Sequence, residues 1–326
     1  MPLLTPEFTN PLFLKLYCEG LKGLGLAAPP AGEAHISDVF ARHLEWKAQR
    51  IATALSLDPA ERVVERAVEK FSEELAAQST EYLPRSEAVK LVSAFAPALH
   101  QWPRTLFGQL LSEGMLAQDV AWSDRGGQPT QVVRFVYQRF ADYRIAGALI
   151  EPFASAAAFR AALRAGQPLR GKISSAPAGW IEALSVLVPE RLGIELLDAT
   201  NWRFKRHRRE RWERALIRSV VTRRPEAMSD RTRALVAAAE RKSRYLQDEV
   251  LEAVLTVAPI PTHPLNADHL HHVLLRDSMP DRDAGWSRRT YYAFGSEGPL
   301  DRLVRWAARG PYPESPDEVL RLATSI

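Results

Sequence analysis

The sequence predicts a mainly α protein with three parts: an N-terminal helix, a winged-helix domain with a small β wing, and a helical array with solenoid-like packing. Two observations carry this prediction. Between Arg104 and Ile150 the spacing of apolar residues changes from helical to extended and back, and after Pro152 it is almost wholly helical. A chain of 326 residues usually forms more than one domain, so we place the units at residues 1–32, 33–153 and 154–326.

The first unit is predicted to be one helix followed by a linker. Apolar residues fall on nearly every side of this helix, so we expect it to be buried against a partner that the chain does not contain. Cys18 lies on the same helix, where a free cysteine is usually inert packing. Residues 27–32 contain paired prolines and a glycine, which indicates a linker. The apolar residues of the helix are Phe13, Leu14, Leu16, Tyr17 and Leu21.

Three amphipathic helices are predicted to follow. Asp58 and Pro59 indicate a helix start, because Asp is a good N-cap and Pro is tolerated in the first turn. A third helix is predicted over residues 84–95, with Ser86 as its cap. The first two helices carry the apolar stripes Phe40, Leu44, Ala48, Ile51 and Leu55, and Val64, Ala67, Val68, Phe71 and Leu75.

The second unit ends in the order helix, strand, turn, strand, helix. A leucine-rich helix ends near Gly114, where a residue without Cβ tolerates a left-handed cap. Strands at 115–122 and 132–136 flank a turn with two glycines and a proline, and such a wing after a helix is typical of a winged-helix module. The closing helix carries the stripe Val136, Phe140, Tyr143, Gly147 and Ile150, and Arg139, Asp142 and Arg144 fall off it.

The third unit reads as a series of helices without a clear repeat period. Pairs of helices of this size resemble solenoid packing. The predicted helices span residues 154–165, 180–188, 201–221, 229–257, 267–276 and 300–308.

Composition limits the function classes. The formal charge of +4 with a pI near 9.2 is a weak indication of anionic partners. One cysteine excludes an internal disulfide and a cysteine metal cage, and favours a cytoplasmic location. The N-terminus does not resemble a secretion signal, and the most apolar run is too short to span a bilayer, so no membrane contact is expected.

No complete catalytic site is apparent, so we expect this chain alone not to be an enzyme. The sequence contains no P-loop and no G-x-S-x-G nucleophile elbow. Gly20, Gly23 and Gly25 lack the following Lys and Ser or Thr of a P-loop, and helix C-capping explains them better. Four clustered histidines lack a carboxylate-histidine motif, so we expect structural roles and no metal; they are His263, His269, His271 and His272.

A cationic segment runs from residue 203 to residue 218, with aromatic residues interleaved. It suits phosphate binding and base stacking, and this favours nucleic acid as a partner through Arg203, Arg206, Arg208, Arg209 and Arg211. The other reading, which we favour, is a solvated helix face whose Trp212, Leu216 and Val220 stripe faces a core. The remaining cations of the segment are Lys205, Arg214 and Arg218.

Several strings, in this order along the chain, together resemble the large antiviral NTPases of the STAND class, relatives of NACHT and NB-ARC proteins. Residues 10–20 look like the start of the helical lid, and residues 110–116 with 133–142 resemble the winged-helix domain and the helix that leaves it. Strings at 180–190, 263–266 and 279–287 look like the helical region beyond. The resemblance is scattered over nearly the whole chain, and its individual motifs are only moderately specific.

This resemblance implies a regulatory and sensing fragment that lacks the P-loop core. In the family a lid proline touches adenine, so Pro11 is the one residue carried over to nucleotide contact; no motif assigns a nucleotide-sensing role to His100. The parent protein would bind ATP or ADP with Mg, and its partners would be the upstream NTPase core, a foreign (phage) protein as trigger, and copies of itself. Target recognition would then drive nucleotide exchange and oligomerisation.

Two other functions remain open. A stand-alone winged-helix nucleic-acid-binding protein would use the wing and the cationic segment, but the helix at 104–113 offers one arginine and mostly leucines, whereas recognition helices need polar side chains. A helical scaffold without any nucleotide connection is the third reading.

Overall fold

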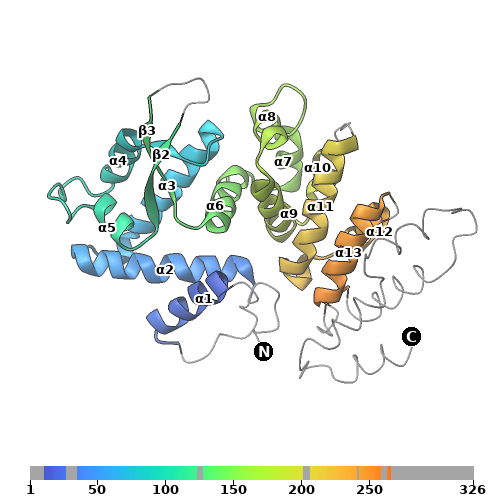
Figure 1. Cartoon of the computed structure of the whole chain (residues 1–326), viewed down its shortest axis with the longest axis horizontal. Coiled ribbons are helices and arrows are strands. Elements are labelled where there is room, and N and C mark those ends of the chain that lie inside the picture. Colours follow the sequence, from blue (N-terminus) through green and yellow to red (C-terminus); the bar gives the residue numbers. More distant parts are fainter. Residues whose placement is uncertain are drawn as a thin grey trace, which may run out of the picture.

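A computed structural model describes residues 11–26, 35–122, 128–200, 206–240, 242–257 and 263–265 of the chain. These residues form a mainly helical protein with one small antiparallel sheet (Figure 1). The elements from residue 11 to residue 150 are α1 (Pro11–Gly23), α2 (Ile36–Leu55), the 3-10 helix η3 (Pro59–Glu61), α3 (Val63–Gln78), β1 (Leu83–Pro84), α4 (Arg85–Ser93), α5 (Leu106–Ser112), β2 (Leu116–Ala121), β3 (Thr130–Phe135) and α6 (Gln138–Ile150). Beyond them lie α7 (Ala156–Ala162), α8 (Pro168–Ser175), α9 (Ala178–Leu192), α10 (Leu196–Thr200), α11 (Arg206–Thr222), η4 (Pro225–Ala227), α12 (Asp230–Glu240) and α13 (Arg244–Val257).

Helix α1 packs against α2, so the expectation that it needs a partner outside this chain was wrong. Phe13 is buried, and its ring meets Phe40 of α2 edge to face at 5.8 Å between centroids. Gly23 permits the close approach of the two helices, since a Cβ there would lie 1.9 Å from the Trp46 indole nitrogen. Gly25 follows with φ +69°, as expected for a C-cap. Cys18 is exposed on α1, which corrects its expected role in packing.

Both predicted stripes of α2 and α3 are buried, and the turn between the two helices is capped as expected. The backbone N–H of Ala60 donates to Asp58 Oδ1 at 2.8 Å, although this cap opens η3 and α3 itself begins at Val63. The predicted cap Ser86 is wrong. It lies inside α4, whose first residue Arg85 follows Pro84.

The reading of residues 104–150 as helix, strand, turn, strand, helix is confirmed for the described part of that range. Thr105 caps α5 by accepting from the Gly108 N–H at 2.9 Å, and Gly114 ends the helix with φ +68°. The sheet has the order β1-β3-β2, with Val133 of β3 paired to Leu83 on one side and to Gln118 on the other. Sequence periodicity misses β1, because two residues are too few to show alternation.

The helices after α6 pack in succession, with α9 on α6, α11 on α9 and α13 on α11 (Figure 1). The predicted single helix at 229–257 is wrong: it is divided into α12 and α13, because the Ser243 hydroxyl accepts from the Leu246 N–H and caps a new helix. Helices α8 and α10 were not predicted. The predicted helices at 267–276 and 300–308, and the linker at 27–32, lie outside the described residues.

The core runs through most of the described chain. One apolar cluster extends without a break from Phe13 on α1 to Ala215 on α11, and a second extends from Leu216 to Leu265. The first cluster crosses residue 153, so apolar contacts join the elements on its two sides. The unit boundaries at 32 and 153 stay a prediction. Of the helices that the structure describes, none is long and apolar enough to cross a membrane.

Candidate functional site at the junction of α6, α9 and α11

Helix α6 occupies the centre of the described chain, between the sheet-containing region and the later helices (Figure 1). It packs on α3 on one side and on α9 on the other. Of its predicted stripe, Phe140, Tyr143 and Ile150 are buried as expected, and Val136 and Gly147 are half-buried. The Phe140 ring meets Phe40 at 5.5 Å and Phe135 at 5.4 Å, so α6 is fixed at once to α2 and to the sheet.

Asp142 is the unexpected residue of this junction. It falls off the predicted stripe, yet it is only 7% exposed. The reason is that α9 covers the face of α6 that would otherwise meet solvent. Gly179 makes this possible, because a Cβ at that position would lie 2.0 Å from Asp142 Oδ2. A helix buried on two sides has a second inner face that a single apolar stripe does not reveal.

The environment of Asp142 disfavours its charged form. Burial raises the pKa of Asp142 to about 7, and the nearby Glu81 and Glu182 carboxylates act in the same direction. Its Oδ1 accepts a hydrogen bond from Gln138 Nε2 at 3.2 Å, and together with Arg139 this opposes the shift. Within the described residues Asp142 has no ion-pair partner. A small gain or loss of neighbouring charge therefore changes its protonation near neutral pH.

A narrow cleft of about 190 Å³ lies beside this carboxyl group. Helix α6 contributes Gln138 and Asp142 to its lining, α9 contributes Glu182, and α11 contributes Arg218 and Thr222. Arg218 is held by two carboxylates: its Nη1 donates to Glu182 at 2.9 Å and its Nε to Glu249 at 3.1 Å. Two polar groups thus lie where the three helices meet: the Asp142 carboxyl group and the Arg218 guanidinium, which two carboxylates hold in place.

Among the cations of the segment whose side chains the structure describes, three form ion pairs with carboxylates: Arg209, Arg214 and Arg218. Besides Arg218, Arg209 pairs with Glu213 at 3.0 Å, and Arg214 lies 3.5 Å from Glu249. Arg211 Nη2 donates to the Ala176 carbonyl. The favoured reading of this segment is confirmed for its inner face, since the whole stripe is buried: Trp212, Leu216 and Val220. Arg203 and Lys205, and the side chains of Arg206 and Arg208, lie outside the described part.

Helix α5, the element that would enter a DNA groove, packs its apolar residues into the core. Leu106, Phe107 and Leu110 are buried. At its C-terminal end Glu113 pairs with Lys47 at 3.3 Å and with Arg50 at 2.9 Å. The surface of α5 therefore offers few free polar groups for base edges.

The remaining candidates are scattered. Pro11 begins α1, but its side chain is outside the described set. His100 is exposed in the loop between α4 and α5. His263 is buried, with Nε2 3.1 Å from the Val220 carbonyl oxygen and Nδ1 accepting from the Leu265 N–H, which fits a structural role.

His269, His271 and His272 lie outside the described residues. Where side chains are described, no group of three or more metal-ligating residues is placed to bind an ion. No family model, curated protein or solved structure matches this chain.

Proposed function

We propose that this chain is the regulatory and sensing part of a STAND-type defence ATPase, which couples recognition of a target protein to nucleotide-dependent oligomerisation. In this proposal α1 belongs to the lid, the region from α2 to β3 is a helical bundle plus a winged-helix domain, and the helices from α7 onward form a solenoid-like array near the sensor. Helix α6 transmits the state of one part to the other.

The order of elements supports the winged-helix assignment. Helices α4 and α5 lead directly into the hairpin of β2 and β3, and β1 from the preceding segment completes the sheet in the order β1-β3-β2. The buried face of α5 and the paired cations of α11 favour a packing element over a DNA reader. The array assignment draws on the succession of α9, α11 and α13.

The buried Asp142 at the α6–α9 contact is the observation that carries the proposal. A switch needs an element with two arrangements of similar free energy, and a carboxyl group without an ion-pair partner among the described residues reduces the preference for the packed arrangement. A ligand shifts such an equilibrium only by its different affinity for the two states. Bound ADP would favour the packed form, and a target protein on the helical array the open one.

The cofactor belongs to the parent protein. ATP or ADP with Mg would sit in the upstream P-loop core, and Pro11 is the residue of this chain that we place against the base. The decisive test is the reading frame upstream of this chain in its natural gene. A P-loop with the pattern G-x-x-x-x-G-K-[ST] is expected there, and a complete gene without one overturns the proposal.

Nucleic-acid binding is the second candidate. It is favoured by Trp122, 73% exposed at the end of β2, and by the cations at 203–208. Binding of duplex DNA to the chain should then fall by orders of magnitude between low and moderate salt, and Arg208→Gln with Arg209→Gln should weaken it. Replacement of Lys70, an exposed cation on α3, is the matched control. Absence of binding at low salt eliminates this candidate.

A further inference from the structure

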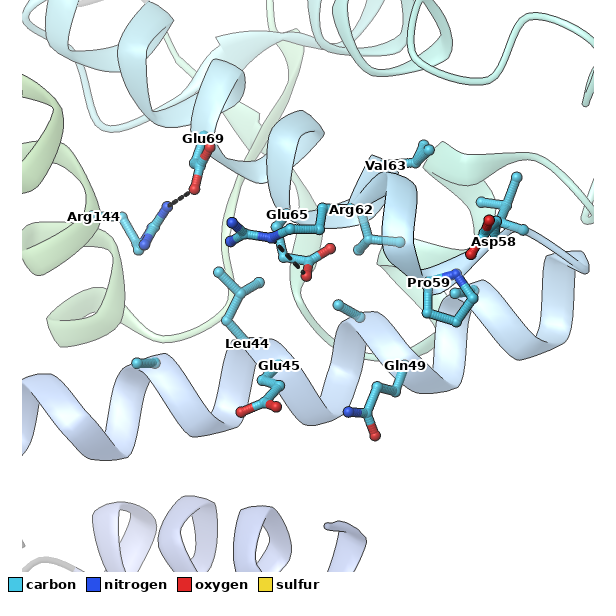
Figure 2. A pocket seen from close by; sticks show the side chains of 15 residues that line it. Leu44, Glu45, Gln49, Asp58, Pro59, Arg62, Val63, Glu65, Glu69 and Arg144 are labelled. Atoms are coloured by element: carbon cyan, nitrogen blue, oxygen red, sulfur yellow. Dashed lines mark ion pairs between the residues drawn. The ribbon is translucent and has the colours of Figure 1, made fainter. Parts of the chain in front are cut away.

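A second cavity lies on the opposite side of α6, between α2 and the beginning of α3 (Figure 2). Its volume is about 500 Å³, in the range of small-molecule sites. Leu44, Ala48 and Ala52 of α2 form an apolar wall, and Val63 and Val64 face them from α3. No step of the proposed function uses this cavity.

Arg144 of α6 closes one end of the cavity and lacks adequate partners. Its side chain is only 26% exposed, and its Nε is buried without a hydrogen-bond partner. Within the described part of the chain its one ion pair is with Glu69, and the 3.7 Å between Nη2 and Oε1 is too long for a hydrogen bond. A guanidinium has five N–H donors, and buried donors are nearly always paired in folded proteins.

Two other cations, Arg191 and Arg62, act on Arg144. Burial lowers the pKa of Arg144, and the Arg191 and Arg62 guanidinium groups lower it further, whereas only Glu69 raises it. In Figure 2 the Arg62 side chain extends along the cavity toward Arg144, and its Nε lies 3.5 Å from the Glu65 carboxylate of α3. An anion at this end would receive hydrogen bonds from Arg144 and reduce the repulsion among three cations.

The other end of the cavity limits what kind of anion fits. Asp58 lies there, away from Arg144 (Figure 2), and the cavity lining also includes the carboxylates of Glu45 on α2 and Glu65 on α3. A polyanion such as nucleic acid would meet these carboxylates and be repelled. A small molecule with one anionic group and an apolar body matches the cation end and the alanine-lined wall together.

We propose that this cavity binds a small carboxylate- or phosphate-bearing ligand, whose anionic group is held by Arg144 with Arg62 as the second cation. When the ligand is absent, Glu69 forms a weak ion pair with the Arg144 guanidinium. The anionic group of the ligand replaces Glu69 on binding. The site requires neither a nucleotide core nor a target protein, so its test is independent of the proposed function.

The test is a titration of the full chain with inorganic phosphate and, in a second arm, with acetate, at constant ionic strength and with calorimetric readout. Whichever anion binds more tightly identifies the chemistry of the natural group. Arg144→Gln should weaken this binding roughly tenfold or more, because a charged donor pair is lost. Lys70→Gln is the control, because Lys70 is an exposed cation on α3 that pairs with Glu73 of the same helix.

Glu69→Gln keeps the proposal falsifiable if the Arg144 variant does not fold. It removes the internal competitor, so binding should become severalfold tighter. A purely structural ion pair would instead make this variant less stable without any effect on anion affinity. The proposal is overturned if neither anion binds the wild-type chain, if Arg144→Gln binds as well as Lys70→Gln does, or if Glu69→Gln leaves the affinity unchanged.

Discussion

The two halves of the described chain bury polar groups in opposite ways. In residues 11–150 the centre is aromatic, and His43 of α2 is buried within it without a hydrogen-bond partner for either ring nitrogen. In residues 156–257 the centre contains a charged residue, Arg223, with several partners. A buried polar group is tolerated either when it is held neutral or when its charge is paired; His43 is an example of the first and Arg223 of the second.

His43 is kept neutral by its surroundings. The rings of Trp46, Tyr137 and Phe140 lie within 6.0 Å of its own, centroid to centroid. Burial lowers the pKa of His43 to about 4, and the charge of Lys47 acts in the same direction. The imidazole therefore serves as part of an apolar core at neutral pH.

Arg223 is held by a network of hydrogen bonds. Its Nη1 and Nη2 donate to the two oxygens of Glu195 at 2.6 and 3.2 Å, and Nη2 also donates to the Ser185 carbonyl at 2.7 Å and to Ser219 Oγ at 2.8 Å. Thr232 of α12 donates to the same carboxylate. The network joins α9, α11 and α12 through hydrogen bonds. In the N-terminal half, by contrast, aromatic rings pack around His43.

The largest expected change in stability comes from disrupting the hydrogen-bond network around Arg223. Glu195→Ala leaves the Arg223 charge buried and unpaired, and the free energy of unfolding in urea should fall by about 3–5 kcal/mol. Asp198→Ala is the matched control, because it removes the more exposed pair with Arg231 and should cost at most about 1 kcal/mol. Equal losses in the two variants would show that the buried Arg223–Glu195 pair contributes no more than the more exposed Arg231–Asp198 pair.

The second effect is a pair of opposed pH dependences. The folded-state pKa of Asp142 is raised from 3.8 to about 7, so the folded form holds its proton longer and Asp142 makes stability fall as pH rises through that window. The folded-state pKa of His43 is lowered from 6.5 to about 4, so His43 makes stability rise with pH between these values. Each slope amounts to about 1.4 kcal/mol per pH unit at most.

Difference curves separate the two groups. The unfolding free energy of Asp142→Asn minus that of the wild type should increase from pH 4 to pH 7 and then level off. The corresponding difference for His43→Leu should decrease from pH 4 to pH 6.5. Groups common to both proteins cancel in such differences. Parallel, flat curves would show that neither group changes its pKa on folding.

The smallest of the three effects concerns the aromatic half. Phe40 meets Phe13, Phe140 and Tyr143 edge to face, at 5.8, 5.5 and 5.3 Å between ring centroids. Phe40→Leu keeps the site apolar but removes these contacts, and thermal or urea unfolding should show a loss of about 1–3 kcal/mol. The exposed Trp122→Leu should change stability by less than about 0.5 kcal/mol. A loss as small for Phe40→Leu would mean that ring geometry contributes nothing.

The sequence by itself determined the elements whose signal is local. The stripes of α2 and α3, the positions of β2 and β3, the end of α5 at Gly114 and the inner face of α11 all follow from spacing, capping and turn chemistry within a few residues. Hydrophobic period and backbone preference depend on near neighbours in the chain, so they can be predicted without a fold.

The tertiary structure alone decided which distant residues meet. The partner of α1, the strand β1, the burial of Asp142 against Gly179 and the cavity at Arg144 each depend on contacts between elements far apart in sequence. The ion pairs of α11 also depend on tertiary contacts, because the carboxylate partners of its cations include Glu182 of α9 and Glu249 of α13. A residue's charge is visible in the sequence, but its solvation and its counter-ion are set only when the helices pack.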